Sequence, residues 1–241
     1  MTGRINYTIT SAKVPFFALR ATQGRQGSEF RVNDALILLY CSSETFKSCK
    51  PAAKMQEIRF HGRGGQGTVV ASIILAKAFF SAGYYVQSFP VFGVERRGAP
   101  VEAYLRLDTE KILVRCNVYT PDHVVVQDVK LLENVPVTGG LKPGGWVLIN
   151  AAAQPASLDI FSGFRLAWVD ATAIAIQNRL GTRTHPIINT AIIGAFARIL
   201  ENPPMAMICD AIKEDIHTQP ERNIQAAKEG YQKVQLIGWV D

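Results

Sequence analysis

The spacing of apolar and polar positions changes near residue 55, and from there to the C-terminus it is typical of an α/β protein. Several short apolar or β-branched runs do not alternate strictly. They predict strands covered on both faces, as in a parallel sheet. These runs are residues 57–60, 85–89, 124–126, 146–149 and 166–169.

Longer stretches with helical spacing follow or separate these runs. They predict helices over residues 68–82, 172–180, 187–200, 205–216 and 221–234. Prolines precede the last three, as is common at helix starts.

One segment has the alternation of an exposed antiparallel pair. Residues 101–107 and 112–116, joined by Asp108–Lys111, predict a β-hairpin. The alternation of strands and helices elsewhere predicts a doubly wound, Rossmann-like α/β domain over residues 55–241. We expect a mostly parallel sheet with helices on both faces.

Residues 1–54 form a separate region in this interpretation, a basic N-terminal extension of low structural content. They mix Arg with Thr, Ser, Gln and Gly, and residues 35–40 are the one helix-like or strand-like piece. The Arg-rich, acid-poor start imitates an organellar transit peptide. The alternative is translated upstream sequence, since Met55 precedes the first strong strand.

Composition and charge narrow the class of function. At 241 residues and 48% hydrophobic residues, the chain can build a sizeable core and is not a disordered protein. The net charge is +6, but eight of the 26 basic and three of the 20 acidic residues lie in residues 1–54. The nearly neutral remainder gives no reason to expect nucleic-acid binding.

The four cysteines and the apolar runs exclude two further classes. No cysteine pair has the CxxC spacing that chelates zinc or an iron–sulfur cluster, and no metal site or catalytic dyad is evident. No apolar run reaches the roughly 20 residues that a membrane span needs. A cytoplasmic, reduced setting is expected.

A glycine-rich turn between a predicted strand and helix is the clearest chemical signal. Gly62, Gly64 and Gly67 satisfy the GxGxxG spacing, which lets backbone N–H groups approach a diphosphate at a helix N-terminus. Arg63 can add a direct positive charge. The alternative is a turn with a purely structural role.

The carboxylate that holds the adenosine ribose in Rossmann dehydrogenases is missing. It normally lies about 20 residues beyond the glycines, at the end of the second strand. Residues 86–89 read Val-Gln-Ser-Phe, and the next carboxylate, Glu95, lies in a loop. A diphosphate ligand other than NAD is therefore expected.

That loop, residues 88–100, is the second unusual segment. It is bracketed by prolines and carries Glu95-Arg96-Arg97-Gly98. Adjacent arginines can clamp a phosphate, although a solvated loop with an internal Glu–Arg pair is the alternative. The residues expected to bind the cofactor are Gly62, Arg63, Gly64, Gly65, Gln66, Gly67, Glu95, Arg96, Arg97 and Gly98.

The glycine loop, the Glu-Arg-Arg-Gly loop and two later segments, taken together in their order along the chain, resemble the gamma subunit of 2-oxoacid:ferredoxin oxidoreductases. This family includes the pyruvate, ketoisovalerate and phenylglyoxylate enzymes. The matching segments are Gly62–Gly67, Phe89-Pro90 with Gly93, Glu95–Val101, Asp170–Thr172 and Asn189–Ala195. The resemblance spans residues 55–241 and does not cover residues 1–54.

The resemblance implies a subunit, inactive alone, of a complex of anaerobic metabolism. Such complexes oxidatively decarboxylate a 2-oxoacid to an acyl-CoA and pass electrons to ferredoxin or NAD. The gamma part contributes to coenzyme A binding, and here the glycine loop with Arg63 and Gln66 would meet the diphosphate. Thiamine diphosphate, magnesium and 4Fe-4S clusters would lie in alpha, beta and delta partner subunits, with an NAD-linked subunit as a further option.

Two other functions stay open from the residues alone. One is a stand-alone nicotinamide-dependent dehydrogenase, which the missing ribose carboxylate disfavours. The other is a purely architectural subunit whose glycine loop binds nothing.

Overall fold

A computed structural model describes residues 37–39, 55–91 and 98–240 of the chain. These residues belong to one compact unit, residues 35–241. The strands are β1 (Ile37–Leu39), β2 (Gln56–Arg63), β3 (Tyr85–Val91), β4 (Pro100–Asp108), β5 (His123–Val126), β6 (Trp146–Asn150), β7 (Arg165–Val169) and β8 (Gln235–Trp239). The α-helices are α1 (Thr68–Ser81), α2 (Ala171–Gln177), α3 (Asn189–Leu200), α4 (Met205–Asp215) and α5 (Pro220–Lys233), and two short 3₁₀ helices are η1 (Val129–Glu133) and η2 (Asp159–Phe161).

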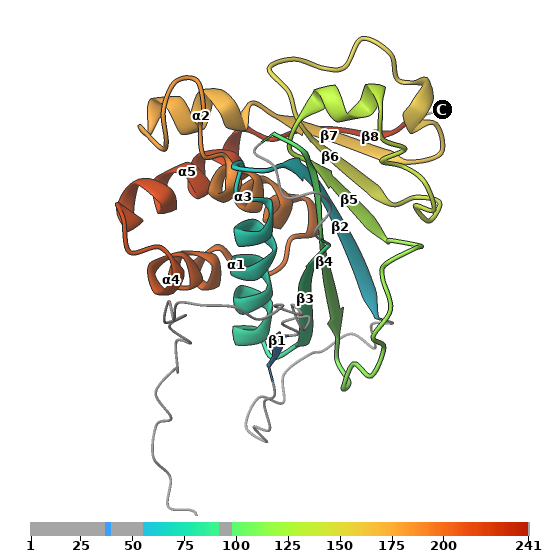
Figure 1. The fold of residues 1–241 in the computed structure, drawn as a ribbon, viewed down its shortest axis with the longest axis horizontal. Helices are drawn as coiled ribbons and strands as arrows, with labels where there is room; N and C mark the ends of the chain where they lie inside the picture. The colour runs from blue at the N-terminus through green and yellow to red at the C-terminus, as the bar shows by residue number, and fades with distance from the viewer. Residues whose placement is uncertain (1–36, 40–54, 92–97, 241) are drawn as a thin grey trace, which may run out of the picture. The chain divides into compact units, whose positions relative to one another are not determined.

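The described strands form one mixed sheet in the order β1-β3-β4-β2-β5-β6-β7-β8 (Figure 1). The central strands β2, β5, β6 and β7 are parallel to one another. The strands outside this group pair antiparallel with their neighbours. The α/β class is confirmed, but the sheet is mixed rather than mostly parallel.

The reason for the difference lies in β4. The predicted hairpin of residues 101–107 with residues 112–116 is wrong, because the second segment forms no strand. Instead β4 forms a hairpin with β3 and inserts between β3 and β2, antiparallel to both. β8, which the sequence pattern did not predict, adds an antiparallel strand beside β7.

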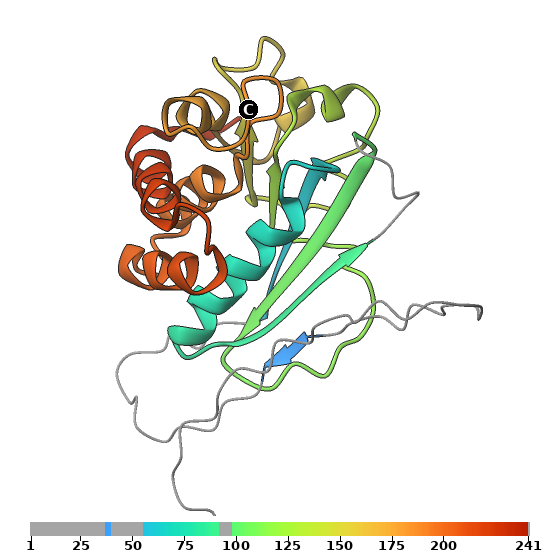
Figure 2. The same ribbon diagram turned by 60° about the vertical axis from the view of Figure 1, so that its left-hand side comes forward.

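Side chains of the parallel strands alternate between two apolar layers. Val125, Leu148 and Ala167 face the layer that contains the five α-helices, whereas Val124 and Ile149 face the layer that contains η1 and η2. Figures 1 and 2 show the α-helices together on one side of the sheet. Burial on both faces explains why these strands read as unbroken β-branched runs.

The chain winds over both faces of the sheet, as predicted. The connection from β2 to β3 passes through α1 on one face, and those from β5 to β6 and from β6 to β7 pass over the other face through η1 and η2. The second face therefore carries 3₁₀ helices and loops rather than α-helices. Residues 134–145, after η1, contain two prolines and four glycines, which oppose a longer helix.

The predicted extension falls mostly outside the described residues. Residues 1–36 and 40–54, and with them the boundary placed at residue 54, are not among those described. Within the extension, the strand-like piece predicted at residues 35–40 corresponds to β1, which pairs with β3. Among the described residues no helix is long and apolar enough to cross a bilayer.

Candidate functional site

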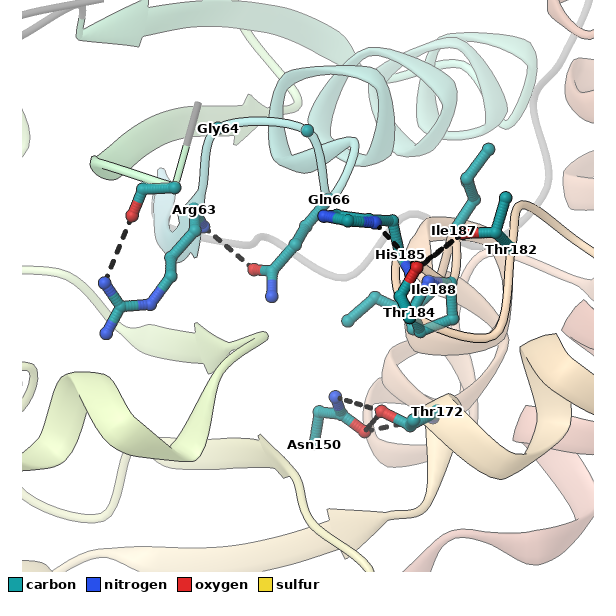
Figure 3. Close-up of a pocket in the computed structure, with 13 residues that line it drawn as sticks. Arg63, Gly64, Gln66, Asn150, Thr172, Thr182, Thr184, His185, Ile187 and Ile188 are labelled. Carbon is teal, nitrogen blue, oxygen red and sulfur yellow. Dashed lines mark hydrogen bonds between the residues drawn. The ribbon is translucent and has the colours of Figure 1, made fainter. Parts of the chain in front are cut away.

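A cavity of about 720 Å³ opens at the carboxyl edge of the parallel strands (Figure 3). This edge is where ligands bind in open α/β sheets. The lining residues come from the glycine loop, from the residues before β4, from the end of β6, from the beginning of α2, and from the turn before α3. They are Arg63, Gly64, Gly65, Gln66, Gly98, Asn150, Thr172, Thr182, Thr184, His185, Pro186, Ile187 and Ile188.

The glycine loop has backbone geometry that glycine adopts without strain. Gly65 has φ +97° and Gly67 has φ +77°, both in the left-handed region. Gly67 is the N-cap of α1 and makes no side-chain cap, and no acidic residue lies in the first turn of the helix. The N-terminal N–H groups of α1 are therefore free of a competing carboxylate, as an anion site requires.

The loop is tied to the beginning of β4. Gly64 N donates to Ala99 O at 2.9 Å, and Gly98 N donates to Gly64 O at 3.1 Å. This pairing places Gly98 on the cavity wall beside the glycine loop. The three residues before it in the predicted site, Glu95, Arg96 and Arg97, lie outside the described residues.

The side chains of the loop make internal contacts. Arg63 Nε donates to Asp128 Oδ2 at 2.7 Å, and Arg63 Nη1 donates to Gly98 O at 3.1 Å. Gln66 Oε1 accepts from Arg63 N at 2.8 Å and so closes the turn. The positive charge of Arg63 is thus shared with a carboxylate from the end of β5, which reduces what it can offer to a phosphate.

The predicted site residues divide into two groups in the structure. Arg63, Gly64, Gly65, Gln66 and Gly98 line the cavity. Gly62 and Gly67 do not line it, and a Cβ at either would meet a packed neighbour. Their role in the structure is close packing, which the GxGxxG spacing also requires.

The opposite wall of the cavity was not predicted from the sequence. Asn150 Nδ2 donates to Gln127 O at 2.9 Å and to Thr172 Oγ1 at 3.0 Å, which joins the end of β6 to the residue after β5 and to the first turn of α2. Asp170–Thr172 had been interpreted as a helix start with Asp170 or Thr172 as its cap, and the capping side chain is Asp170. The available signal for Asn150 was its position directly after a predicted parallel strand, and for Thr172 its position at the start of the helix that follows one.

The turn before α3 completes that wall with hydroxyl and imidazole groups. Thr182 and His185 exchange backbone hydrogen bonds of 3.1 and 3.2 Å, which close the turn. Thr184 Oγ1 lies 3.0 Å from His185 Nδ1 and 3.2 Å from Thr182 Oγ1. These polar side chains are exposed at the cavity.

His61, next to the glycine loop, belongs to a buried network and does not line the cavity. Its Nε2 accepts from Arg59 Nε at 3.0 Å, and its Nδ1 lies 3.5 Å from Glu102 Oε1. Tyr104 donates to the other oxygen of Glu102 at 2.7 Å. Burial lowers the pKa of His61 to about 4, with Arg59 adding to the effect and Glu102 opposing it.

A second buried histidine, His123 at the start of β5, also has a lowered pKa. Its Nδ1 accepts from Trp146 N at 3.2 Å, and burial lowers its pKa to about 4. In an unfolded chain a histidine titrates near pH 6.5. Between these values the unfolded chain binds more protons than the folded one, so stability falls as the pH drops.

We therefore expect the free energy of unfolding to decrease as the pH falls from about 6.5 to about 4. The expected slope is about 1.4 kcal/mol per pH unit for each of the two histidines. Urea unfolding at several pH values measures it. His61→Gln should lower the slope by about half, and a slope equal to wild type in this variant would contradict the assignment.

Comparison with known proteins places this chain in a family. The sequence profile of the pyruvate ferredoxin/flavodoxin oxidoreductase family matches residues 57–233. The pyruvate synthase subunit PorC of Methanocaldococcus jannaschii is 47% identical over 181 residues, which are 75% of this chain and 97% of that protein. The pyruvate/ketoisovalerate oxidoreductases common subunit gamma of Pyrococcus abyssi is 46% identical, over 76% of this chain and 99% of that protein.

Solved structures support the same family. The pyruvate oxidoreductase subunit PORC of Thermotoga maritima is 35% identical, with a TM-score of 0.66 over 77% of this chain and 99% of that one. A 2-oxoglutarate:ferredoxin oxidoreductase from Magnetococcus marinus, 20% identical with a TM-score of 0.62 over 75% of this chain and 31% of its own, shares the fold. The resemblance expected from the ordered motifs is confirmed: the chain belongs to the pyruvate ferredoxin/flavodoxin oxidoreductase family, among its gamma subunits.

Proposed function

We propose that this gamma subunit binds coenzyme A in the cavity beside the glycine loop. The complex to which it belongs would oxidatively decarboxylate a 2-oxoacid, such as pyruvate or a branched-chain or aryl 2-oxoacid, to the acyl-CoA. Electrons would leave to ferredoxin or to NAD. Thiamine diphosphate with magnesium, and 4Fe-4S clusters, would be held by the partner subunits, in a cytoplasmic setting.

The observation that carries the proposal is the chemistry of the glycine loop. It presents backbone N–H groups at the N-terminus of α1, and no carboxylate lies in the first helical turn. Gly64 and Gly65 line the cavity without a side chain that could occupy it. Such a loop suits a diphosphate, which coenzyme A carries. The Magnetococcus enzyme that shares the fold was solved with coenzyme A and succinyl-CoA bound.

The sheet order disfavours the stand-alone NAD dehydrogenase. In dinucleotide-binding Rossmann folds the ribose carboxylate lies at the end of the strand reached through the first helix. Here that strand, β3, ends in Phe89-Pro90-Val91 and is separated from β2 by β4. Among the described residues, β3 ends without a carboxylate, and its end does not lie beside the end of β2.

We propose alpha, beta and delta subunits as the partners of the chain. The surface of the loop between β4 and β5 supports a role in an assembly. Leu113 is 74% exposed and Tyr119 is 69% exposed, and both lie in this loop. Large exposed apolar side chains that gather in one segment are typical of protein contacts.

Gly65→Leu tests whether the loop receives coenzyme A. Gly65 lines the cavity, and a Cβ there would have no atom of the described residues within 4 Å, so a new side chain occupies open space at the cavity wall and not the protein interior. We expect the KM for coenzyme A to rise about tenfold, a loss of about 1.4 kcal/mol, with the KM for the 2-oxoacid unchanged. Steady-state kinetics of the assembled complex measure both constants.

Gly163→Leu is the matched control. Gly163 also has a positive φ, +78°, with no described atom near its Cβ, but it lies away from the cavity in the loop before β7. It should leave both KM values at wild type. Unchanged kinetics in Gly65→Leu would favour the architectural role, and tight binding of NADH by the isolated chain without any effect of coenzyme A would favour the dehydrogenase.

A further inference from the structure

Two buried amide side chains lie beside the start of α1, and neither N–H₂ group has an acceptor among the described residues. Gln127 follows β5 and is fully buried. Its Oε1 accepts from Thr68 Oγ1 at 2.6 Å, whereas its Nε2 has no partner. An unsatisfied buried donor is rare in folded proteins, because it keeps the cost of lost hydration.

The second amide belongs to Asn189, the first residue of α3. Asn189 is 3% exposed, and its Oδ1 accepts from Thr190 N at 2.8 Å. No described residue accepts a hydrogen bond from its Nδ2. A Cβ at Gly67 would lie only 2.9 Å from this nitrogen, so the amide group packs directly against the N-cap of α1.

The N-termini of α1 and α3 therefore meet at a place that has several free hydrogen-bond donors and few free acceptors. The first backbone donor used within α1 is Ala71 N, which leaves the N–H groups of the first turn without intrahelical acceptors. α3 likewise has no side-chain cap and no acid in its first turn. Both amide oxygens are already bonded. Asp128, which follows β5 and contacts the glycine loop, is paired with Arg63 at 2.7 Å.

We propose that the junction of the α1 and α3 N-termini is an anion subsite in which Asn189 Nδ2 and the first-turn N–H groups of α1 bind phosphate oxygens of the coenzyme A diphosphate. This inference rests on the proposed function and names the side chain that selects the ligand. Asn189, which follows the cavity-lining Ile188, is the direct contact. Gln127 is fully buried beneath the start of α1, so its unpaired Nε2 acts on the anion through its positive dipole and not by contact.

The test uses variants that remove only the donors. Asn189→Asp keeps the oxygen that accepts from Thr190 N, and Gln127→Glu keeps the oxygen that accepts from Thr68. Both substitutions replace an N–H₂ group by an acceptor that repels phosphate. With the chain in its assembled complex, we expect calorimetry to show coenzyme A binding weakened about 30-fold in Asn189→Asp and about tenfold in Gln127→Glu.

Inorganic diphosphate is the second probe. It should compete with coenzyme A in wild type and lose most of this competition in Asn189→Asp. Asn178→Asp in α2 is the charge-matched control, because its Nδ2 already donates to Ile174 O and to Glu229 Oε1. It should bind coenzyme A as wild type does.

The possible results distinguish a failure of the anion subsite from a failure of the proposed binding of coenzyme A. If wild type binds neither probe, the proposed function is wrong. If wild type binds coenzyme A and Asn189→Asp binds it equally well, the subsite is wrong and the proposed function stands. Binding of coenzyme A without competition by diphosphate, or tighter binding in Gln127→Glu, would also overturn the subsite.

Discussion

Replacing Gly194 by alanine is expected to lower the free energy of unfolding by about 3 kcal/mol. A Cβ at this position would lie 1.8 Å from Ala227 O and 2.6 Å from Ala227 C, both backbone atoms of α5. The contact is reciprocal, because a Cβ at Gly230 would lie 2.0 Å from Ala191 O of α3. Backbone atoms cannot turn aside as a flexible side chain can, so the two helices must separate.

Urea unfolding of the full chain measures this loss, and Gly163→Ala is its control. Gly163 has a positive φ but no described atom within 4 Å of its Cβ, so alanine there adds only left-handed strain of about 1–2 kcal/mol. Equal losses in the two variants would show that the close approach of α3 and α5 is not what Gly194 provides. α3 begins at Asn189, directly after the cavity-lining Ile188, so a displacement of α3 would also move this part of the cavity wall.

Helices and parallel strands could be predicted because their signals are local. The small and apolar residues of α1, and the prolines at the starts of α4 and α5, mark elements that the structure contains. The strands β5, β6 and β7 were recognised because burial on both faces leaves no polar alternation.

The antiparallel strands depended on long-range pairing, which local pattern does not encode. β4 alternates as an edge or hairpin strand does, yet its partners are β3 and β2 rather than residues 112–116. Those residues instead supply carbonyl groups, such as Val114 O, which accepts from the buried Gln87 at 3.0 Å. Tertiary hydrogen bonds to buried polar side chains override the β-propensity of this segment.

One wall of the cavity could be predicted and the other could not, for the same reason. The glycine loop is contiguous, so the sequence alone groups Gly64, Gly65 and Gln66, which line the cavity, and their binding of a cofactor stays a prediction. The other wall, with Asn150 and Thr172, is assembled only when separate strand ends meet at one edge. The orphaned nitrogen of Gln127 has no sequence signal, since it depends on which atoms surround it.

Gly62→Ala is the second substitution with a large expected effect, again about 3 kcal/mol in the free energy of unfolding. A Cβ at Gly62 would lie 2.0 Å from Thr68 Oγ1 and 2.7 Å from Gln127 Oε1. Thr68 is the first residue of α1, so the extra methyl group must push the helix start away from β2. We also expect weaker binding of coenzyme A, by about tenfold, because the donors of the first turn are displaced.

A double-mutant cycle identifies the atom responsible. Thr68→Ala removes the crowding hydroxyl, so the loss in Gly62→Ala/Thr68→Ala should be smaller than the sum of the single losses by about 1–2 kcal/mol. Thr68→Ser keeps the hydroxyl and should give no such relief with Gly62→Ala. If alanine and serine at residue 68 relieved Gly62→Ala equally, the steric role of Thr68 Oγ1 would be excluded, and the shape of the glycine loop would depend on other contacts of β2.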